Sequence, residues 1–159
     1  MLTSISLPPF NFIFINFFTF SSFFLFLVNK LDQSINKKLF FIYGWFFGFG
    51  YFVSNLYWIS ISLSFDQNFQ FLIPFTLLLI PSFLALFYGV ISYLFMIIKP
   101  KKILSSIFIF SLIFGVVEFI RGSILTGFPW NLIVYSFSNQ LEVLSIIALI
   151  GTYGLNLFC

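Results

Sequence analysis

Glu118 and Arg121 are the residues of this chain best suited to chemistry, because they form an acid–base pair inside an otherwise apolar stretch. On a helix, residues three positions apart share one face, so the two side chains can form an ion pair that fixes the helix end. Alternatively, Arg121 could hold the phosphate of a lipid or another acidic headgroup through its planar guanidinium. Glu118 could also serve as a general base, but no nucleophile or second titrating partner is visible for it. The ion pair and the lipid-binding arginine both stay open as interpretations.

The segment after this pair has the composition of a bent loop. Gly122 can end the preceding helix, and Pro129 can neither continue it nor let Phe128 adopt helical backbone angles. Trp130 then fits an anchor at the membrane surface, where tryptophan is common. It could also form a wall of an outward-facing lipid cavity, with Gly127 and Pro129 shaping the loop.

Several other kinds of site are excluded by composition. The chain has no histidine and one cysteine, Cys159, so an internal disulfide, a Cys–His pair and a histidine-based metal site cannot form. Cys159 lies in an apolar segment with no base nearby, and we interpret it as structural or accidental. We expect no metal and no cofactor.

The overall composition predicts an integral membrane protein. Hydrophobic residues make up 61% of the chain and charged residues 7%, whereas soluble domains contain roughly 25% charged residues. Too little polar surface remains to cover a globule in water. We therefore expect an all-α fold, a polytopic transmembrane helix bundle.

The apolar runs are long enough for about five spans of ~20 residues each. The third run would extend ~42 Å as a straight helix, so we expect it to tilt, to kink or to emerge from the membrane, with Pro74 and Pro81 as the kink points. Gly44 and Gly48 lie four apart in the second run, which predicts close approach of a neighbouring helix. The expected spans are residues 10–28, 39–59, 71–98, 103–120 and 141–159.

The charges predict how the chain is oriented. Two clusters lie between apolar runs and hold six of the seven basic residues: Lys30, Lys37 and Lys38, and Lys99, Lys101 and Lys102. This arrangement is typical of topology signals and not of the basic face of a nucleic-acid-binding domain, so we expect no nucleic-acid partner. Placing both clusters in the cytoplasm puts the N-terminus, the polar connection 60–70 and the loop 127–131 outside.

The residues around the acid–base pair carry a family resemblance. Glu118, Arg121 and Gly122, followed by the run Thr126 to Trp130, resemble the membrane domain of the apolipoprotein N-acyltransferases. The spacing is similar without a gap, although Val134 stands where a glycine is usual. Residues 8–11, 47–51 and 57–59 look similar as well, so the resemblance extends from about residue 8 to the end.

The resemblance implies a bacterial inner-membrane enzyme that transfers an acyl chain from a phospholipid to the N-terminal diacylglyceryl-cysteine of a lipoprotein. It implies a Glu, Lys and Cys triad in a nitrilase-like domain outside the membrane, and none of those positions occurs in this sequence. The implied partners are a phospholipid acyl donor, a lipoprotein acceptor, the bilayer and the catalytic domain. The candidate lipid- or substrate-binding residues are Glu118, Arg121, Gly127, Pro129 and Trp130.

We therefore expect the membrane portion of such an enzyme, lacking the family's first helix and its nitrilase-like domain, and inactive alone. The alternative is a small polytopic scaffold or transport-type protein without an acyltransferase role. A gene remnant is a third possibility, although the absence of stray charges from the expected spans argues against it.

Overall fold

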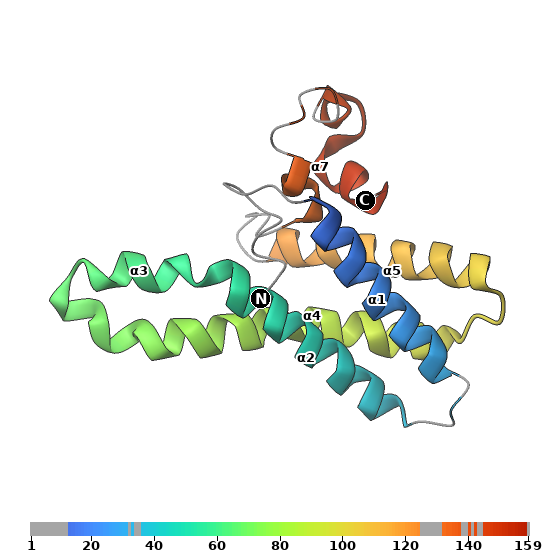
Figure 1. Ribbon diagram of the computed structural model, residues 1–159, viewed down its shortest axis with the longest axis horizontal. Helices are drawn as coiled ribbons and strands as arrows, with labels where there is room; N and C mark the ends of the chain where they lie inside the picture. The colour runs from blue at the N-terminus through green and yellow to red at the C-terminus, as the bar shows by residue number, and fades with distance from the viewer. Residues whose placement is uncertain are drawn as a thin grey trace.

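The computed structural model describes residues 13–31, 33, 36–124, 132–137, 140, 142 and 145–158, and these residues form helices and turns without any strand (Figure 1). The prediction of an all-α transmembrane bundle is therefore confirmed. The α-helices and the two short 3-10 helices, labelled η, are α1 (Ile13–Leu31), α2 (Lys37–Leu56), α3 (Trp58–Ser64), η2 (Gln67–Leu72), α4 (Ile73–Ile98), α5 (Ile103–Ile124), η3 (Ile133–Phe137) and α7 (Ile147–Phe158).

Four segments in the described part of the chain are long and apolar enough to cross a membrane: Phe14–Leu31, Lys37–Leu56, Gln67–Ile98 and Ile103–Ile124. They make this a multi-pass membrane protein. The last apolar run contains α7, which has 12 residues and is interrupted at Gly151, where φ is 74° and ψ is 165°. A helix of this length is shorter than the ~20 residues a span requires. The fifth span expected over 141–159, which includes residues outside the described ranges, stays a prediction.

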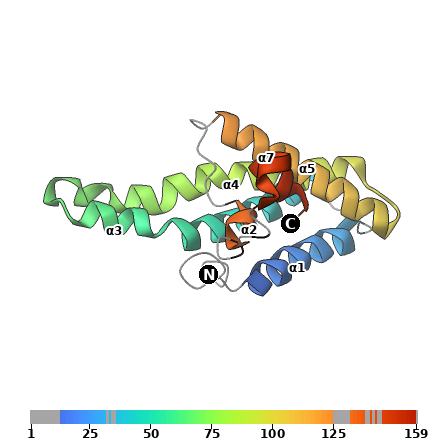
Figure 2. The same ribbon diagram turned by 90° about the horizontal axis from the view of Figure 1, so that it is seen from above.

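The second and third spans form one long antiparallel hairpin. Figures 1 and 2 both show its closed end, with α3 on one arm, projecting beyond the rest of the bundle. The expected polar connection 60–70 contains helix on both sides of Asp66, because α3 continues to Ser64 and η2 begins at Gln67. The reason is local: the Asp66 side chain accepts a hydrogen bond from the Asn68 amide at 2.9 Å and starts η2.

The two arms pack closely through glycine. A β-carbon on Gly44 would overlap the carbonyl oxygen of Tyr88, and one on Gly48 would lie 2.7 Å from the Tyr88 Cβ. Trp45 also reaches across, donating a hydrogen bond from Nε1 to the Ser82 carbonyl at 3.1 Å. These contacts confirm the close approach predicted from the glycine spacing.

The third span is a single helix despite its prolines. Pro74 lies in the first turn of α4, where the missing amide costs no intrahelical hydrogen bond. Pro81 lies inside α4 and is buried, and the helix continues through it to Ile98.

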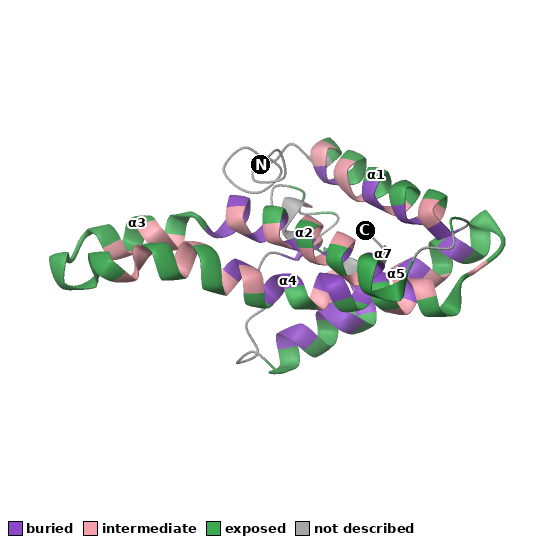
Figure 3. Cartoon of the chain, turned by 90° about the horizontal axis from the view of Figure 1, so that it is seen from below, coloured by how far each residue is buried: buried purple, intermediate pink, exposed green. Residues whose placement is uncertain are grey.

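Aromatic rings fill the core between the helices. Phe23 of α1 stacks on Phe47 of α2 with ring centres 3.9 Å apart, and Phe20 makes an edge contact with Phe114 of α5 at 5.5 Å. Figure 3 shows buried positions on the faces that meet and exposed positions on the outside. Phe14, which is 85% exposed, is one of many large apolar side chains on that outer surface, as expected for contact with lipid.

All six lysines gather at one end of the bundle. The end of α1, the start of α2, the end of α4 and the start of α5 meet there, so the two lysine clusters predicted to share one membrane face lie at the same end. The lysines at this end are Lys30, Lys37, Lys38, Lys99, Lys101 and Lys102. Arg121 lies near the far end of α5.

Candidate functional site

Helix α5 carries Glu118 and Arg121 in its last two turns and continues to Ile124. The interpretation of Gly122 as the end of this helix is therefore wrong. Gly122 lies inside the helix, and its small size serves close packing: a β-carbon there would overlap the hydroxyl of Tyr153 in α7. Glycine is as suitable for such an approach as for ending a helix.

Glu118 and Arg121 form a buried ion pair. Arg121 Nη2 lies 2.5 Å from Glu118 Oε2. Arg121 is only 2% exposed and Glu118 only 1%. Two charges removed from solvent in this way are stable only as partners, since either one alone would be costly to bury.

Aromatic residues of α2 and α4 surround the pair. The guanidinium carbon of Arg121 lies 5.4 Å from the ring centre of Phe52, which is a cation–π distance. Phe52 makes an edge contact with Tyr88 at 5.3 Å, and Tyr51 stacks on Tyr88 at 5.8 Å. Both tyrosines are buried, and both interact electrostatically with Glu118 and Arg121. We call Tyr51, Phe52 and Tyr88 the aromatic wall.

One oxygen of this site has spare bonding capacity. Glu118 Oε1 is buried and accepts no hydrogen bond from any residue in the described ranges. An unsatisfied buried acceptor costs about 1–3 kcal/mol. This oxygen therefore marks a position where a hydrogen-bond donor would be stabilised.

The other candidate residues, Gly127, Pro129 and Trp130, lie outside the described residues. Before them α5 runs to Ile124, which is 68% exposed, and after them Leu132 and Val134 are buried. The structure thus brings together Glu118 and Arg121 among the predicted site residues.

Helix α7 covers the end of α5 beside the pair. Besides its contact with Gly122, Tyr153 makes an edge contact with Phe119, with ring centres 5.4 Å apart. Leu155 completes a small second core with the residues that follow the candidate loop. Two features of the sequence are consistent with this contact: the glycine at position 122, and the glycines at positions 151 and 154 on either side of Tyr153.

The aromatic wall was also missed by sequence reasoning. The one feature of the sequence that points to it is the pair Gly44 and Gly48 in α2, which lets Tyr88 of α4 approach α2 closely. Within the described residues, no three side chains of the metal-binding types come together.

Comparison with known proteins places this geometry in a family. Residues 1–159 match the apolipoprotein N-acyltransferase N-terminal domain. The protein named apolipoprotein N-acyltransferase from Rickettsia prowazekii (strain Madrid E) is 39% identical over 140 residues, which cover 87% of this chain and 27% of that protein. Proteins of the same name from Brucella melitensis biotype 1 and Allorhizobium ampelinum are 40% identical over 114 residues and 33% identical over 160 residues.

The alignments with the Brucella and Allorhizobium proteins cover 71% and 96% of this chain, but 21% and 30% of those proteins. The chain therefore spans less than a third of the length of the curated relatives it matches. No solved structure matches it. The match over the whole chain shows that this protein belongs to the apolipoprotein N-acyltransferase family, within which it corresponds to the N-terminal membrane domain.

Proposed function

We propose that this chain is the membrane portion of an acyltransferase that moves an acyl chain from a phospholipid to the N-terminal diacylglyceryl-cysteine of lipoproteins. In this proposal the bundle holds both lipid substrates beside a nitrilase-like domain that carries out the reaction. The enzyme would lie in the bacterial inner membrane, with the N-terminus of this chain and the loop 127–131 outside. The supporting observation is the buried Glu118–Arg121 pair directly before that loop.

The pair itself acts in this proposal as a positioning element. Arg121 is almost wholly buried, and its guanidinium is held between Glu118 and Phe52. This burial favours the ion-pair interpretation over direct binding of a lipid phosphate. The pair would fix the direction in which the chain leaves α5, and so the position of the following loop.

Gly127, Pro129 and Trp130 are then the residues that would contact lipid. This assignment rests on the family resemblance, in which the corresponding loop borders the entry region of the acyl donor. A tryptophan at the membrane surface can pack its ring against acyl chains while its N–H stays near the headgroups.

The transport-type alternative needs a polar pathway through the membrane. Among the described residues, the buried charged side chains are Glu118 and Arg121. They form an ion pair with each other and so do not line a polar pathway. No observation favours this alternative over the acyltransferase.

The proposal can be tested with a chimaera in which this chain replaces the aligned segment of the Rickettsia prowazekii protein. Acylation of a diacylglyceryl-cysteine lipopeptide, with phospholipid as donor, would be followed by mass spectrometry. We expect the chimaera to transfer the acyl chain and its Trp130→Ala variant to lose at least about tenfold, which corresponds to ~1.4 kcal/mol. A chimaera that inserts and folds like the parent but transfers nothing would contradict the proposal.

The purified 159-residue chain is the matching control. We expect it to transfer no acyl chain, because the Glu, Lys and Cys positions implied by the family have no counterpart in it. Acyl transfer by this chain alone would overturn the assignment of the reaction to a separate domain.

A further inference from the structure

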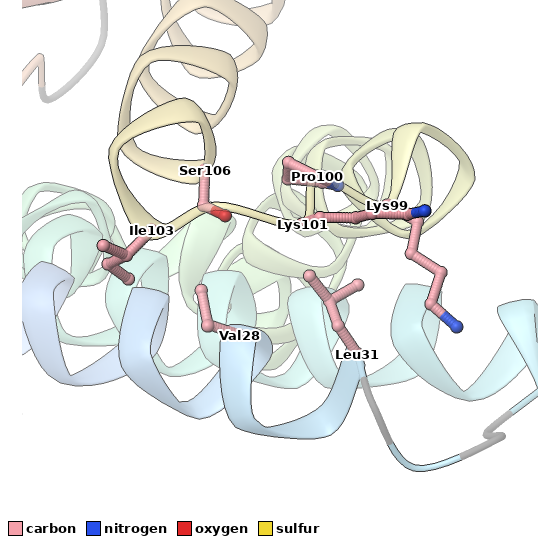
Figure 4. Close-up of a pocket in the computed structure, with 7 residues that line it drawn as sticks. All are labelled: Val28, Leu31, Lys99, Pro100, Lys101, Ile103 and Ser106. Atoms are coloured by element: carbon pink, nitrogen blue, oxygen red, sulfur yellow. The ribbon is translucent and has the colours of Figure 1, made fainter.

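A cavity of about 280 Å³ lies at the lysine-rich end of the bundle, between α1 and the turn that joins α4 to α5 (Figure 4). Its walls include Val28 and Leu31 from α1, Lys99, Pro100 and Lys101 from the turn, and Ile103 at the start of α5. Arg121 lies 18 residues further along α5 (121 − 103 = 18), which corresponds to ~27 Å of helix. The cavity is thus far from the candidate site described above.

The cavity combines positive charge with an absence of acidic groups. Lys99 and Lys101 are exposed at its edge, neither forms an ion pair with any described residue, and no lining residue is acidic. The first turn of α5, which begins at the cavity, also lacks an acidic residue. The partial positive charge at that helix start therefore adds to the two ammonium groups.

The backbone at Lys99 is unusual. Its φ of 45° and ψ of 62° are left-handed, and it is the one residue other than glycine with a positive φ in the described part of the chain. Its amide closes α4 with a hydrogen bond to the Phe95 carbonyl at 3.0 Å, a role that glycine fills with less strain. The left-handed backbone at this position favours glycine. The lysine that stands there instead places a positive charge at the edge of the cavity.

Exposed apolar side chains lie within one helical turn of the residues that line the cavity. Leu104 and Ile107 on the first turns of α5 are 63% and 45% exposed, and Leu25 on α1 is 52% exposed. A ligand with a negatively charged head and apolar chains would match both parts. The volume suits a headgroup, because a whole lipid is far larger.

We propose that this cavity binds the phosphate-bearing headgroup of an anionic membrane phospholipid, with the acyl chains lying along α1 and α5. Lys99, Lys101 and the start of α5 hold the phosphate. Basic pockets between membrane helices suit such headgroups, and each lysine near the surface adds to the attraction. This lipid is distinct from the acyl donor, which would bind near the other end of α5.

The test measures binding of phosphatidylglycerol and of phosphatidylcholine with identical chains to the purified chain in detergent, by native mass spectrometry. We expect phosphatidylglycerol to bind at least about tenfold more tightly. The double variant Lys99→Gln/Lys101→Gln should lose this preference. The variant Lys37→Gln/Lys38→Gln is the matched control, because it removes the same charge at the same end of the bundle but outside the cavity, and it should keep the preference.

Two further measurements make the outcome decisive. Lys99→Gly removes the charge while suiting the left-handed backbone, so it should fold normally and still bind phosphatidylglycerol more weakly than the parent chain. Inorganic phosphate should not displace the lipid, because it lacks the acyl chains that lie along α1 and α5. The proposal is overturned if the cavity variants keep the preference, if both double variants lose it equally, or if inorganic phosphate alone occupies the site and displaces the lipid.

Discussion

The guanidinium carbon of Arg121 lies 5.4 Å from the ring centre of Phe52, so α2 supplies an aromatic face to a charge that belongs to α5. Phe52 is fully buried, and Glu118 holds the same guanidinium from within α5. Arg121 is therefore stabilised by an anion on its own helix and by a ring on another. This arrangement links the end of α5 to the position of α2.

Removing one partner of this ion pair should destabilise the bundle strongly. Arg121→Met leaves the Glu118 carboxylate buried without its cation, and such losses cost about 3–5 kcal/mol. The double variant Glu118→Leu/Arg121→Met removes both charges and should recover most of that loss. Unfolding of both variants in detergent, followed by circular dichroism, measures the difference. If the double variant is less stable than the single one, the pair is not the source of the effect.

The same double variant separates the two interpretations of Arg121. Placed in the chimaeric acyltransferase, it should keep acylation within about tenfold of the parent, since a positioning pair is replaced by packed apolar groups. The measurement is the dependence of the rate on phospholipid concentration. A folded double variant with a greatly raised KM for phospholipid would instead assign Arg121 to binding of the lipid phosphate.

The glycines of α2 should differ sharply in their tolerance of alanine. Gly44 faces the backbone carbonyl of Tyr88, which cannot move without moving α4, so Gly44→Ala should cost about 3 kcal/mol. Gly50 has nothing within 4 Å of its added methyl group, and Gly50→Ala should leave stability unchanged or slightly raised. Thermal unfolding of the two variants in one detergent tests this contrast, and equal effects would contradict the observed packing.

These contrasts also show what the sequence could predict. The spacing of Gly44 and Gly48 indicated close helix packing, and the spacing of Glu118 and Arg121 indicated an ion pair, because both signals are local. The aromatic wall could not be predicted, since the chain has 29 phenylalanines and seven tyrosines that sequence alone does not distinguish. Which ring lies under Arg121 depends on the crossing of α2 and α5.

The differences from these predictions have equally physical causes. Polar residues between the second and third spans predicted a connection over 60–70, and within it Asp66 caps the short helix η2, so part of the connection is helical. Gly122 was misinterpreted because glycine suits both a helix end and a close contact. The structure shows the close contact, since Tyr153 of α7 lies against Gly122.

Gly122→Ala should therefore affect α7 and leave the rest of the bundle intact. The nearest group is the hydroxyl end of the Tyr153 side chain, which can swing away, so the expected cost is only about 1 kcal/mol. Adding Tyr153→Phe to the Gly122→Ala variant removes the overlapping oxygen and should recover part of the lost stability. Limited proteolysis of α7 and thermal unfolding together measure the local and the global effect. A collapse of global stability equal to that of Gly44→Ala would contradict this view.

Lys99→Gly should stabilise the protein while weakening its binding of anionic lipid. The left-handed backbone at Lys99 costs a residue with a β-carbon roughly 1–2 kcal/mol, and glycine relieves that cost while its amide still donates a hydrogen bond to the Phe95 carbonyl. Lys99→Ala is the matched control, because it also removes the charge but keeps the strain, so it should not stabilise. Unfolding in a zwitterionic detergent isolates the backbone effect from the lipid. Equal stability of the glycine and alanine variants would show that the backbone at this position is not strained.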